Sequence, residues 1–527
     1  MRHRWTITAA VALAAFFTGG WFWTGVKSAE ADRFQQARLF ERVLNLVRDY
    51  YVDSLPEPEL YRDAAYGLVA GLNDPYSALL LEDDLERAEE RTTGDYGGIG
   101  ARIDVRNGWV TVVATLPDTP AERAGIRTGD RIVAVEGEST HGWSVDRAVN
   151  TLRGEVGTRV AVGVSRVGHE EPFEVSLRRS RVHQRSVAGA VTLADGVGYV
   201  SVDVVRARSA SELGTEVGQL YAKGIRGLII DLRGNPGGVR DEAVLAAELF
   251  LDPQDHILVT RGRTEADNLL FVDSMPQPWP DLSIVVLVNG GSISAAEILA
   301  GALQDHDRAL IVGQTTFGKG LVQTQFHFSE GAALRITTAR WLTPSGRSIQ
   351  RASVDIPHGD AVDTTVAPVY FSSAGRKLYG GGGIRPDVAV TLDTLSDGER
   401  RLVEVLEPHF SQYRDAIAAV AFDAKRGGMV TDESFMVSQA QLDELRRQLA
   451  AREISVPDSV WAGGRTLVES HLGYEIARYQ FGNSAELKRR LGDDGQVRRA
   501  VELLRMSESR EDLFELAGTP LPSERQG

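Results

Sequence analysis

The chain has no cysteine, no basic excess and no cluster of histidine and acidic residues at metal-ligand spacing. With no cysteine among 527 residues, disulfides, thiol nucleophiles and a lipidated cysteine are excluded. Lys and Arg number 58 against 73 Asp and Glu, so the net charge of −15 does not supply the basic face that nucleic-acid phosphates require. We therefore expect no metal, no other cofactor and no nucleic-acid partner.

Charge is also absent from residues 5–26, an apolar segment that follows the basic start Met1–Arg4. As a helix this segment would extend about 33 Å, enough for a bilayer core of roughly 30 Å. A basic flank before it predicts a cytoplasmic N-terminus and an exported body. We expect an anchor in the inner membrane of a bacterial envelope, with the body on the periplasmic side. The poor cleavage site Ala29–Ala31 leaves a cleaved signal peptide as the alternative.

One serine follows a buried-strand pattern at a glycine-rich turn. Ser294 comes after the apolar run Ser283–Val288 and two glycines, and Ala295–Leu303 has a helical pattern. The hydroxyl is thus predicted at a strand-to-helix turn, close to free N–H groups that favour developing negative charge. A serine at such a place is usually only a helix cap, so this feature alone does not indicate catalysis.

The next glycine-bounded turn carries a lysine. Lys319 lies between Gly318 and Gly320, and Gln323 follows four residues later. Neutral lysine can take a proton from serine if burial lowers its pKa from about 10.4. A lysine between glycines is usually a solvated turn, so the combination with Ser294 is what points to acyl transfer. A third turn, Asp231–Gly238 after the strand pattern Gly227–Ile230, can aim backbone N–H groups at an oxyanion.

In this order, the three turns resemble those of the carboxy-terminal processing peptidases, also called tail-specific proteases. The resemblance covers about residues 35 to 395, and its main matches are Gly224–Gly238, Val288–Asp305 and Ile311–Gln323. It implies that Ser294 is the nucleophile, that Lys319 is the base and that Gln323 orients the lysine. Ser292 would be a structural neighbour. The oxyanion donors would be the N–H of Ala295 and that of Gly237 or Gly238.

A second module precedes these turns. Thr119–Val135 resembles the central signature of a PDZ domain. In PDZ domains the matching loop, here Gly98, Ile99, Gly100 and Ala101, offers backbone N–H groups to a peptide's terminal carboxylate, and the strand after it can accept an added strand. We expect Ile99 to line a pocket for an apolar last residue. Arg153 is a candidate for coupling this domain to the protease.

These patterns divide the chain into an N-terminal segment, four further regions and one insertion. Alternating strand and helix patterns after Val197 indicate an α/β core, which the resemblance implies is crotonase-like. The predicted parts are the anchor or signal peptide 1–31, a helical region 32–92, a β-rich PDZ domain 93–182, a protease core 183–395 with an insertion at about 348–382, and a helical tail 396–527.

Three smaller expectations concern single elements. In the N-terminal region, an i, i+3, i+4, i+7 spacing predicts a buried helix face formed by Phe40, Val43, Leu44, Val47 and Tyr51. His306 is expected to be a surface loop residue without a catalytic role. A capping-box pattern at Ser396–Glu399 predicts where the helical tail begins.

Together the patterns predict an exported serine endopeptidase that cuts proteins near their C-termini. Its partners would be peptides with free C-termini, the membrane through the N-terminal anchor, and a second copy of the chain through N- or C-terminal helices. One alternative is a catalytically inert peptide-binding scaffold, in which only the PDZ domain works. Another is a crotonase-type acyl-CoA enzyme, which would not explain the PDZ domain or the export signal.

Overall fold

The computed structural model describes residues 34–166, 169–328, 331–351, 367–519 and 521, so the predicted anchor lies outside the described residues. The chain forms two compact units. One comprises the described residues up to Leu80 with Gln325–Ile336, and the other comprises the remainder. In the described part of the chain, no helix has both the length and the apolar character of a membrane span.

The N-terminal unit is mainly helical, as predicted, but its apolar stripe is not a buried face. It contains a helix at residues 34–50, α2 (Glu57–Ala70) and β1 (Ala78–Leu81), and α3 (Glu82–Thr93) follows in the second unit. The prediction of burial was wrong for four of the five residues. Only Leu44 is buried; the others are 38–55% exposed, namely Phe40, Val43, Val47 and Tyr51. The periodicity identified the helix, but a stripe forms a core face only where other elements cover it.

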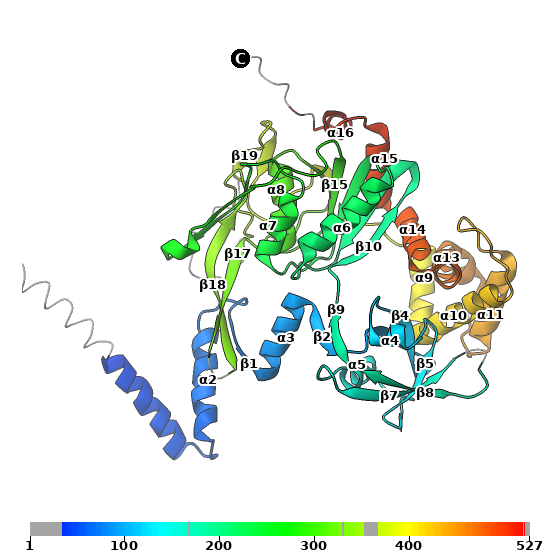
Figure 1. Cartoon of the computed structure of the whole chain (residues 1–527), viewed down its shortest axis with the longest axis horizontal. Coiled ribbons are helices and arrows are strands. Elements are labelled where there is room, and N and C mark those ends of the chain that lie inside the picture. Colours follow the sequence, from blue (N-terminus) through cyan, green and yellow to red (C-terminus); the bar gives the residue numbers. More distant parts are fainter. Residues whose placement is uncertain (1–33, 167–168, 329–330, 352–366, 520, 522–527) are drawn as a thin grey trace, which may run out of the picture. The chain divides into compact units, whose positions relative to one another are not determined.

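The core of the second unit is a largely parallel sheet (Figure 1). Its order is β10-β11-β12-β15-β16-β21, with β10 antiparallel to β11 and the other neighbours parallel. The strands are β10 (Val187–Thr192), β11 (Val197–Val202), β12 (Gly227–Asp231), β15 (Ser283–Val288), β16 (Leu310–Gly313) and β21 (Val388–Ala389). The predicted α/β core, with its alternating strands and helices, is therefore confirmed.

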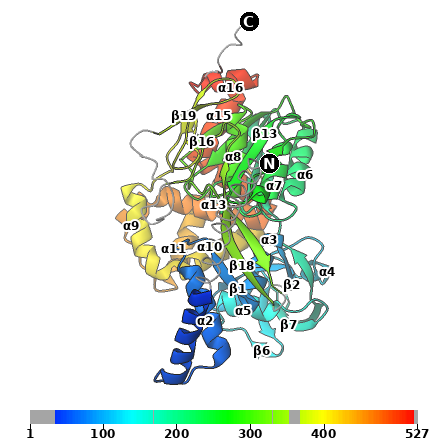
Figure 2. The same cartoon turned by 90° about the vertical axis from the view of Figure 1, so that its left-hand side faces the viewer.

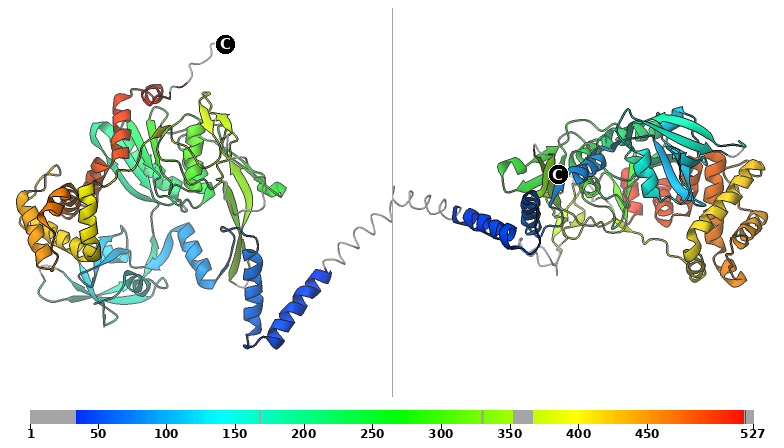
Figure 3. Two further views of the ribbon diagram at one scale, coloured as in Figure 1. Left: turned by 180° about the vertical axis from the view of Figure 1, so that it is seen from behind. Right: turned by 90° about the horizontal axis from the view of Figure 1, so that it is seen from below.

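Helices cover both faces of this sheet. Side chains alternate along a strand, so Ile284 and Val286 of β15 pack on one face while Val285 and Leu287 pack on the other. The first face carries α6 (Ser209–Ala222), α7 (Arg240–Glu248) and α8 (Ala295–Asp305). The second carries the C-terminal helices α15 (Gly495–Met506) and α16 (Arg510–Leu516), drawn in red in Figure 3.

A second sheet has the order β1-β18-β13-β14, with β17 also paired to β18. Its further strands are β13 (His256–Gly262), β14 (Leu270–Val272), β17 (Leu321–His327) and β18 (Ala332–Leu342).

The predicted insertion contains one short antiparallel pair, β19 (Val369–Phe371) and β20 (Lys377–Tyr379), while 352–366 lie outside the described residues. Short 3₁₀ turns occur at Ala194–Gly196, Glu265–Asp267 and Glu407–His409.

The predicted PDZ region forms its own sheet, β3-β4-β5-β7-β8, with β6 paired to β5, around a separate apolar core. A two-stranded pair, β2 (Asp95–Gly98) with β9 (Ser180–His183), leads into and out of it. Its other elements are β3 (Ala101–Arg106), β4 (Trp109–Thr115), α4 (Pro120–Arg123), β5 (Arg131–Val135), β6 (Glu138–Ser139), α5 (Val145–Leu152), β7 (Arg159–Ser165) and β8 (Phe173–Arg178).

The C-terminal region is helical, as predicted, and its first helix begins at the predicted cap. Ser396 Oγ accepts a 3.3 Å hydrogen bond from Glu399 N at the start of α9 (Asp397–Leu406). Figure 2 shows α9, α10, α11 and α13 gathered into a bundle, and their buried side chains form a core separate from that of the α/β sheet. The other helices are α10 (Phe410–Arg426), α11 (Gln439–Ala450), α12 (Asp458–Gly463), α13 (Arg465–Phe481) and α14 (Asn483–Asp493).

Candidate active site

Ser294 lies where β15 ends and α8 begins, as predicted. It is the residue before the first turn of α8, and its backbone has φ +56° and ψ −109°. A positive φ is uncommon for a residue other than glycine and persists only where the surroundings hold it. The adjacent Ser292 is fully buried, donates from Oγ to Leu232 O at 2.7 Å, and accepts from Asn289 N at 3.0 Å. Ser292 therefore ties the turn to β12.

A buried carboxylate that the sequence reasoning missed joins the serine turn to the lysine turn. Glu297 Oε2 accepts from Ser294 N at 2.7 Å and from Lys319 N at 3.0 Å. Its Oε1 accepts from Gly318 N at 2.7 Å and from Thr316 Oγ1 at 2.5 Å. Burial raises the pKa of Glu297, although these donors act to lower it. The capping-box position three residues after Ser294 was the signal that could have identified this residue.

Further contacts fix the backbone around Lys319. Phe317 N donates to Ser292 O at 3.1 Å, and the indole Nε1 of Trp341 donates to Lys319 O at 3.1 Å. On β17, Gln323 donates from Nε2 to Thr337 Oγ1 at 3.2 Å. The segment from Thr316 to Gln323 is thus held by the serine turn and by β18.

The glycine turn after β12 packs directly on the serine turn. A Cβ on Gly237 would lie 2.5 Å from Ile293 O and 3.0 Å from Ala295 N, so only glycine fits there. Gly237 N donates to Asn235 Oδ1 at 2.8 Å. In the described ranges, the N–H groups of Gly238 and Ala295 donate to no acceptor. The two glycines, which the sequence left equivalent as oxyanion donors, therefore differ in the structure. Within the described residues, the N–H of Gly237 is already bound, and that of Gly238 is not.

Charged residues anchor this glycine turn. Arg233 contacts Asp231 at 2.6 Å and Asp494 at 2.8 Å. Asp231 Oδ2 also accepts from Tyr199 OH at 2.8 Å, and burial followed by the Asp231 charge raises the pKa of that tyrosine. Asp494 in turn caps α15 by accepting from Gln496 N and Val497 N. The C-terminal helices therefore support the turn beside Ser294.

The predicted carboxylate loop lies at one end of a groove in the PDZ region. A cavity of about 290 Å³ is bordered by Gly98, Ile99, Gly100 and Ala101 and by α5. Gly100 has φ +77°, and a Cβ there would lie 2.2 Å from Thr119. Within the described residues, the N–H groups of Ile99 and Gly100 have no acceptor. Ile99 is only 3% exposed, so it belongs to the PDZ core as well as to the groove.

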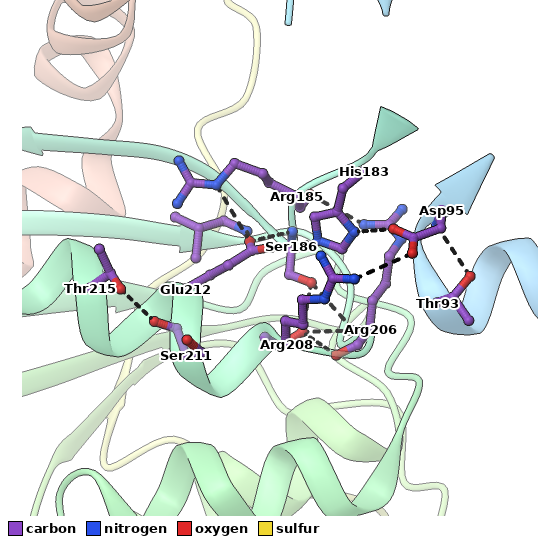
Figure 4. Close-up of polar contacts among 12 residues, drawn as sticks. Thr93, Asp95, His183, Arg185, Ser186, Arg206, Arg208, Ser211, Glu212 and Thr215 are labelled. Atoms are coloured by element: carbon purple, nitrogen blue, oxygen red, sulfur yellow. Dashed lines mark hydrogen bonds and ion pairs between the residues drawn. The ribbon is translucent and has the colours of Figure 1, made fainter. Parts of the chain in front are cut away.

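Polar contacts fix the junction between the PDZ region and the α/β core (Figure 4). His183 on β9 contacts Asp95 on β2 through Nδ1 at 2.6 Å and Glu212 on α6 through Nε2 at 2.8 Å. Arg208 approaches Asp95 at 3.4 Å. Arg153, which borders the groove, contacts Glu90 at 2.8 Å. His183 thus links both connecting strands to the core.

Two further expectations concern histidine and metals. His306 is not the predicted surface residue, because its side chain is only 13% exposed. It lies 2.7 Å from His256 O through Nε2 and 3.1 Å from Ser373 Oγ through Nδ1, so the turn after α8 is packed against other segments. Among the residues that the structure describes, no group of three or more His, Cys, Asp and Glu could hold a metal ion.

Comparison with known proteins identifies two family models in the chain. Residues 196–357 match peptidase family S41 and residues 111–166 match a PDZ domain. A carboxy-terminal-processing protease of Bartonella bacilliformis is 34% identical over 61% of this chain and 74% of its own length. Carboxy-terminal processing protease CtpA of Bacillus subtilis is 31% identical over 66% of this chain and 74% of its own length. The solved photosystem II D1 C-terminal processing protease is 28% identical, with a TM-score of 0.36, over 66% of this chain and 85% of that one.

The contacts of Glu297 predict a large cost for removing its charge. In Glu297→Gln, the amide NH₂ would face N–H donors, so some of them would lose their acceptor. We expect a loss of about 3 kcal/mol in the free energy of unfolding, measured with denaturant. Glu502→Gln is the matched control, since that side chain is 49% exposed and its ion pair should contribute less than about 0.5 kcal/mol. Equally small losses in the free energy of unfolding of both variants would show that Glu297 does not hold the serine turn and the lysine turn together.

The His183 contacts predict local loosening without global unfolding. His183→Ala removes both contacts of the ring, so we expect amide hydrogen exchange in β2 and β9 to accelerate by about tenfold. This corresponds to a loss of roughly 1.4 kcal/mol in the free energy of local opening. The exposed His141, which makes an edge contact with the ring of Trp109, gives the control variant His141→Ala. Unchanged exchange in β2 and β9 would show that His183 does not hold the junction.

Proposed function

The chain belongs to peptidase family S41, the carboxy-terminal processing serine proteases, and we propose that Ser294 and Lys319 form its catalytic dyad. The observation that carries the proposal is the bridge made by Glu297. One buried carboxylate binds the backbone N–H of both residues and so fixes their two turns against each other. Serine and lysine on separately held turns can form a nucleophile–base pair without histidine, cysteine or metal.

The proposed reaction starts with proton transfer from Ser294 Oγ to the neutral Lys319 amine. Ser294 Oγ then attacks the substrate carbonyl, and the protonated lysine gives its proton to the leaving amine. Water hydrolyses the resulting ester and regenerates the hydroxyl. Gln323, on the strand after Lys319, would orient the lysine.

The N–H groups of Gly238 and Ala295 are the best candidates for the oxyanion hole. Both belong to turns that pack against Ser294, and in the described chain neither donates elsewhere. Gly237 is the weaker candidate because its N–H already binds Asn235 Oδ1 at 2.8 Å. Gly237 would instead contribute through its close packing on the serine turn, which lets the N–H of Gly238 reach the site. Donors fixed in advance stabilise the transition state without reorganisation.

The PDZ domain would recognise the substrate's C-terminus. Gly98, Ile99, Gly100 and Ala101 form a loop at the start of β3, where N–H groups without acceptors can bind a carboxylate. A peptide can then pair with β3, the edge strand of this sheet. An inert scaffold would use this groove as well, so only the catalytic variants below distinguish the two functions.

The apolar segment at residues 5–26 suggests the setting of the protein. We assign the body to the periplasmic side of a bacterial envelope, anchored in the inner membrane by residues 5–26, and the core to the crotonase-like fold. Proteins with free C-termini would be its substrates. A homodimer through N- or C-terminal helices is favoured by the exposed apolar stripe at Phe40, Val43 and Val47.

Single substitutions test the dyad. Ser294→Ala and Lys319→Ala should each abolish cleavage of an unfolded protein substrate, because groups that act as a unit lose nearly all activity when either is removed. Ser292→Ala should keep most activity despite a stability loss of about 1 kcal/mol from its two hydrogen bonds. Cleavage is followed on gels with circular dichroism as the folding control. An active Ser294→Ala beside an inactive Ser292→Ala would refute the assignment.

The pH profile tests the base. Since the proposed base is neutral lysine, kcat/KM should rise with pH from neutral until that amine is deprotonated. Chelation with EDTA should leave the rate unchanged, because no step uses a metal. The measurement is initial rate against pH, with folding monitored at each point. A rate that falls above neutral pH in the folded enzyme, or that is lost in EDTA, would contradict the mechanism.

A further inference from the structure

A second cavity lies against β3, between the PDZ domain and the C-terminal helices α10 and α13. Its volume is about 480 Å³. Two carboxylates, Asp104 and Glu475, contribute to its lining. Its wall contains five arginines, namely Arg102, Arg106, Arg414, Arg478 and Arg490. Burial and then the Arg490 charge lower the pKa of His471, which therefore adds no charge to this wall at neutral pH. Positive charge thus predominates in the lining.

The two carboxylates do not satisfy all of these guanidinium groups. Glu475 contacts Arg106 at 3.1 Å and also Arg478. Asp104 contacts Arg414 and lies 3.6 Å from Arg106 Nε. Arg490 pairs with Glu486 at 2.9 Å. The side chain of Arg478 is only 10% exposed, yet its Nε is buried without a hydrogen-bond partner in the described structure. Buried donors are normally paired, so the unpaired Nε of Arg478 in this cavity wall indicates a site for an acceptor.

This cavity is adjacent to the peptide groove, since Arg102 and Ile103 border both. Ile103 packs on the PDZ core, whereas Asp104 and Arg106 of the same strand border the charged cavity. The outer face of the strand therefore meets α10 and α13. Asn107 N reinforces that contact by donating to Asp415 Oδ2 at 3.0 Å.

A peptide on the free edge of β3 would reach both cavities. With its carboxylate at the loop before Ala101, it must run antiparallel to β3, and its side chains alternate between the two faces. The last and third-last side chains then enter the groove beside Val149 and Leu152. The second and fourth side chains from the end point to the other face, toward the arginines.

We propose that the arginine-lined cavity binds an aspartate or glutamate at the second or fourth position from the substrate's C-terminus. The protease would thus select tails that combine an apolar last residue with an upstream acid. A carboxylate accepts strongly from guanidinium groups. The side chain of Arg102 is exposed, and within the described structure it forms no ion pair or hydrogen bond, although its charge acts on Asp203. This inference rests on the proposed PDZ recognition of a free C-terminus.

Peptide binding to the full chain tests the inference. The chain would carry Ser294→Ala to prevent cleavage, and fluorescence polarisation would compare labelled peptides with Asp or Asn at the second and fourth positions from the end. We expect the acidic peptides to bind about fivefold more tightly at low salt and to lose that advantage at high salt. Arg102→Gln should reduce the preference. Arg147→Gln should retain it, because Arg147 pairs with Glu138 and borders neither cavity.

The same assay separates failure of the inference from failure of the proposed function. Equal binding of Asp and Asn peptides, with free C-termini still preferred over amidated ones, would overturn the acidic selection and leave the PDZ role intact. Preference retained in both arginine variants would also overturn it, because the acid would then bind elsewhere. Equal binding of free and amidated peptides would remove the PDZ recognition on which the inference rests.

Discussion

The geometry beside Ser294 depends on one buried charge. Glu297 is fully buried and accepts from Ser294 N, Thr316 Oγ1, Gly318 N and Lys319 N. Burying a carboxylate is costly unless donors surround it, so these four groups and the charge stabilise one another. Loss of any one donor would weaken the hold on the others. The unusual backbone angles of Ser294 fit this view, since the first of the four donors is its own N–H.

The C-terminal helices complete the core as well as extend the chain. Helices α15 and α16 cover a sheet face that would otherwise expose Val285 and Leu287 of β15 to water. Through Asp494 at the start of α15, they also hold Arg233 and the glycine turn beside Ser294. A chain ending before α15 would thus lose part of its core and a support of its candidate site.

The sequence revealed local features and missed long-range ones. Turn and strand patterns located Ser294, the glycine turn and the PDZ loop, because each depends on neighbouring residues. Glu297 looked like an ordinary helix residue, since its partners in the lysine turn are distant in sequence. The stripe around Phe40 and the packed His306 were misjudged for the same reason, because periodicity does not say what covers a side chain. The sequence also did not reveal that the N–H of Gly237 is already bound to Asn235 Oδ1.

The PDZ domain is held from two sides, which constrains how a ligand can act on it. His183 fixes its connecting strands to α6, while Arg106 and Asn107 fix the end of β3 and the turn after it to the C-terminal bundle. β3 is also the strand beside the peptide groove. A ligand that pairs with β3 therefore binds an element whose other face already takes part in domain docking. Any difference in its affinity for docked and undocked states must change the docking equilibrium by the same free energy. If such a difference exists, β3 alone is sufficient to link peptide binding to domain docking.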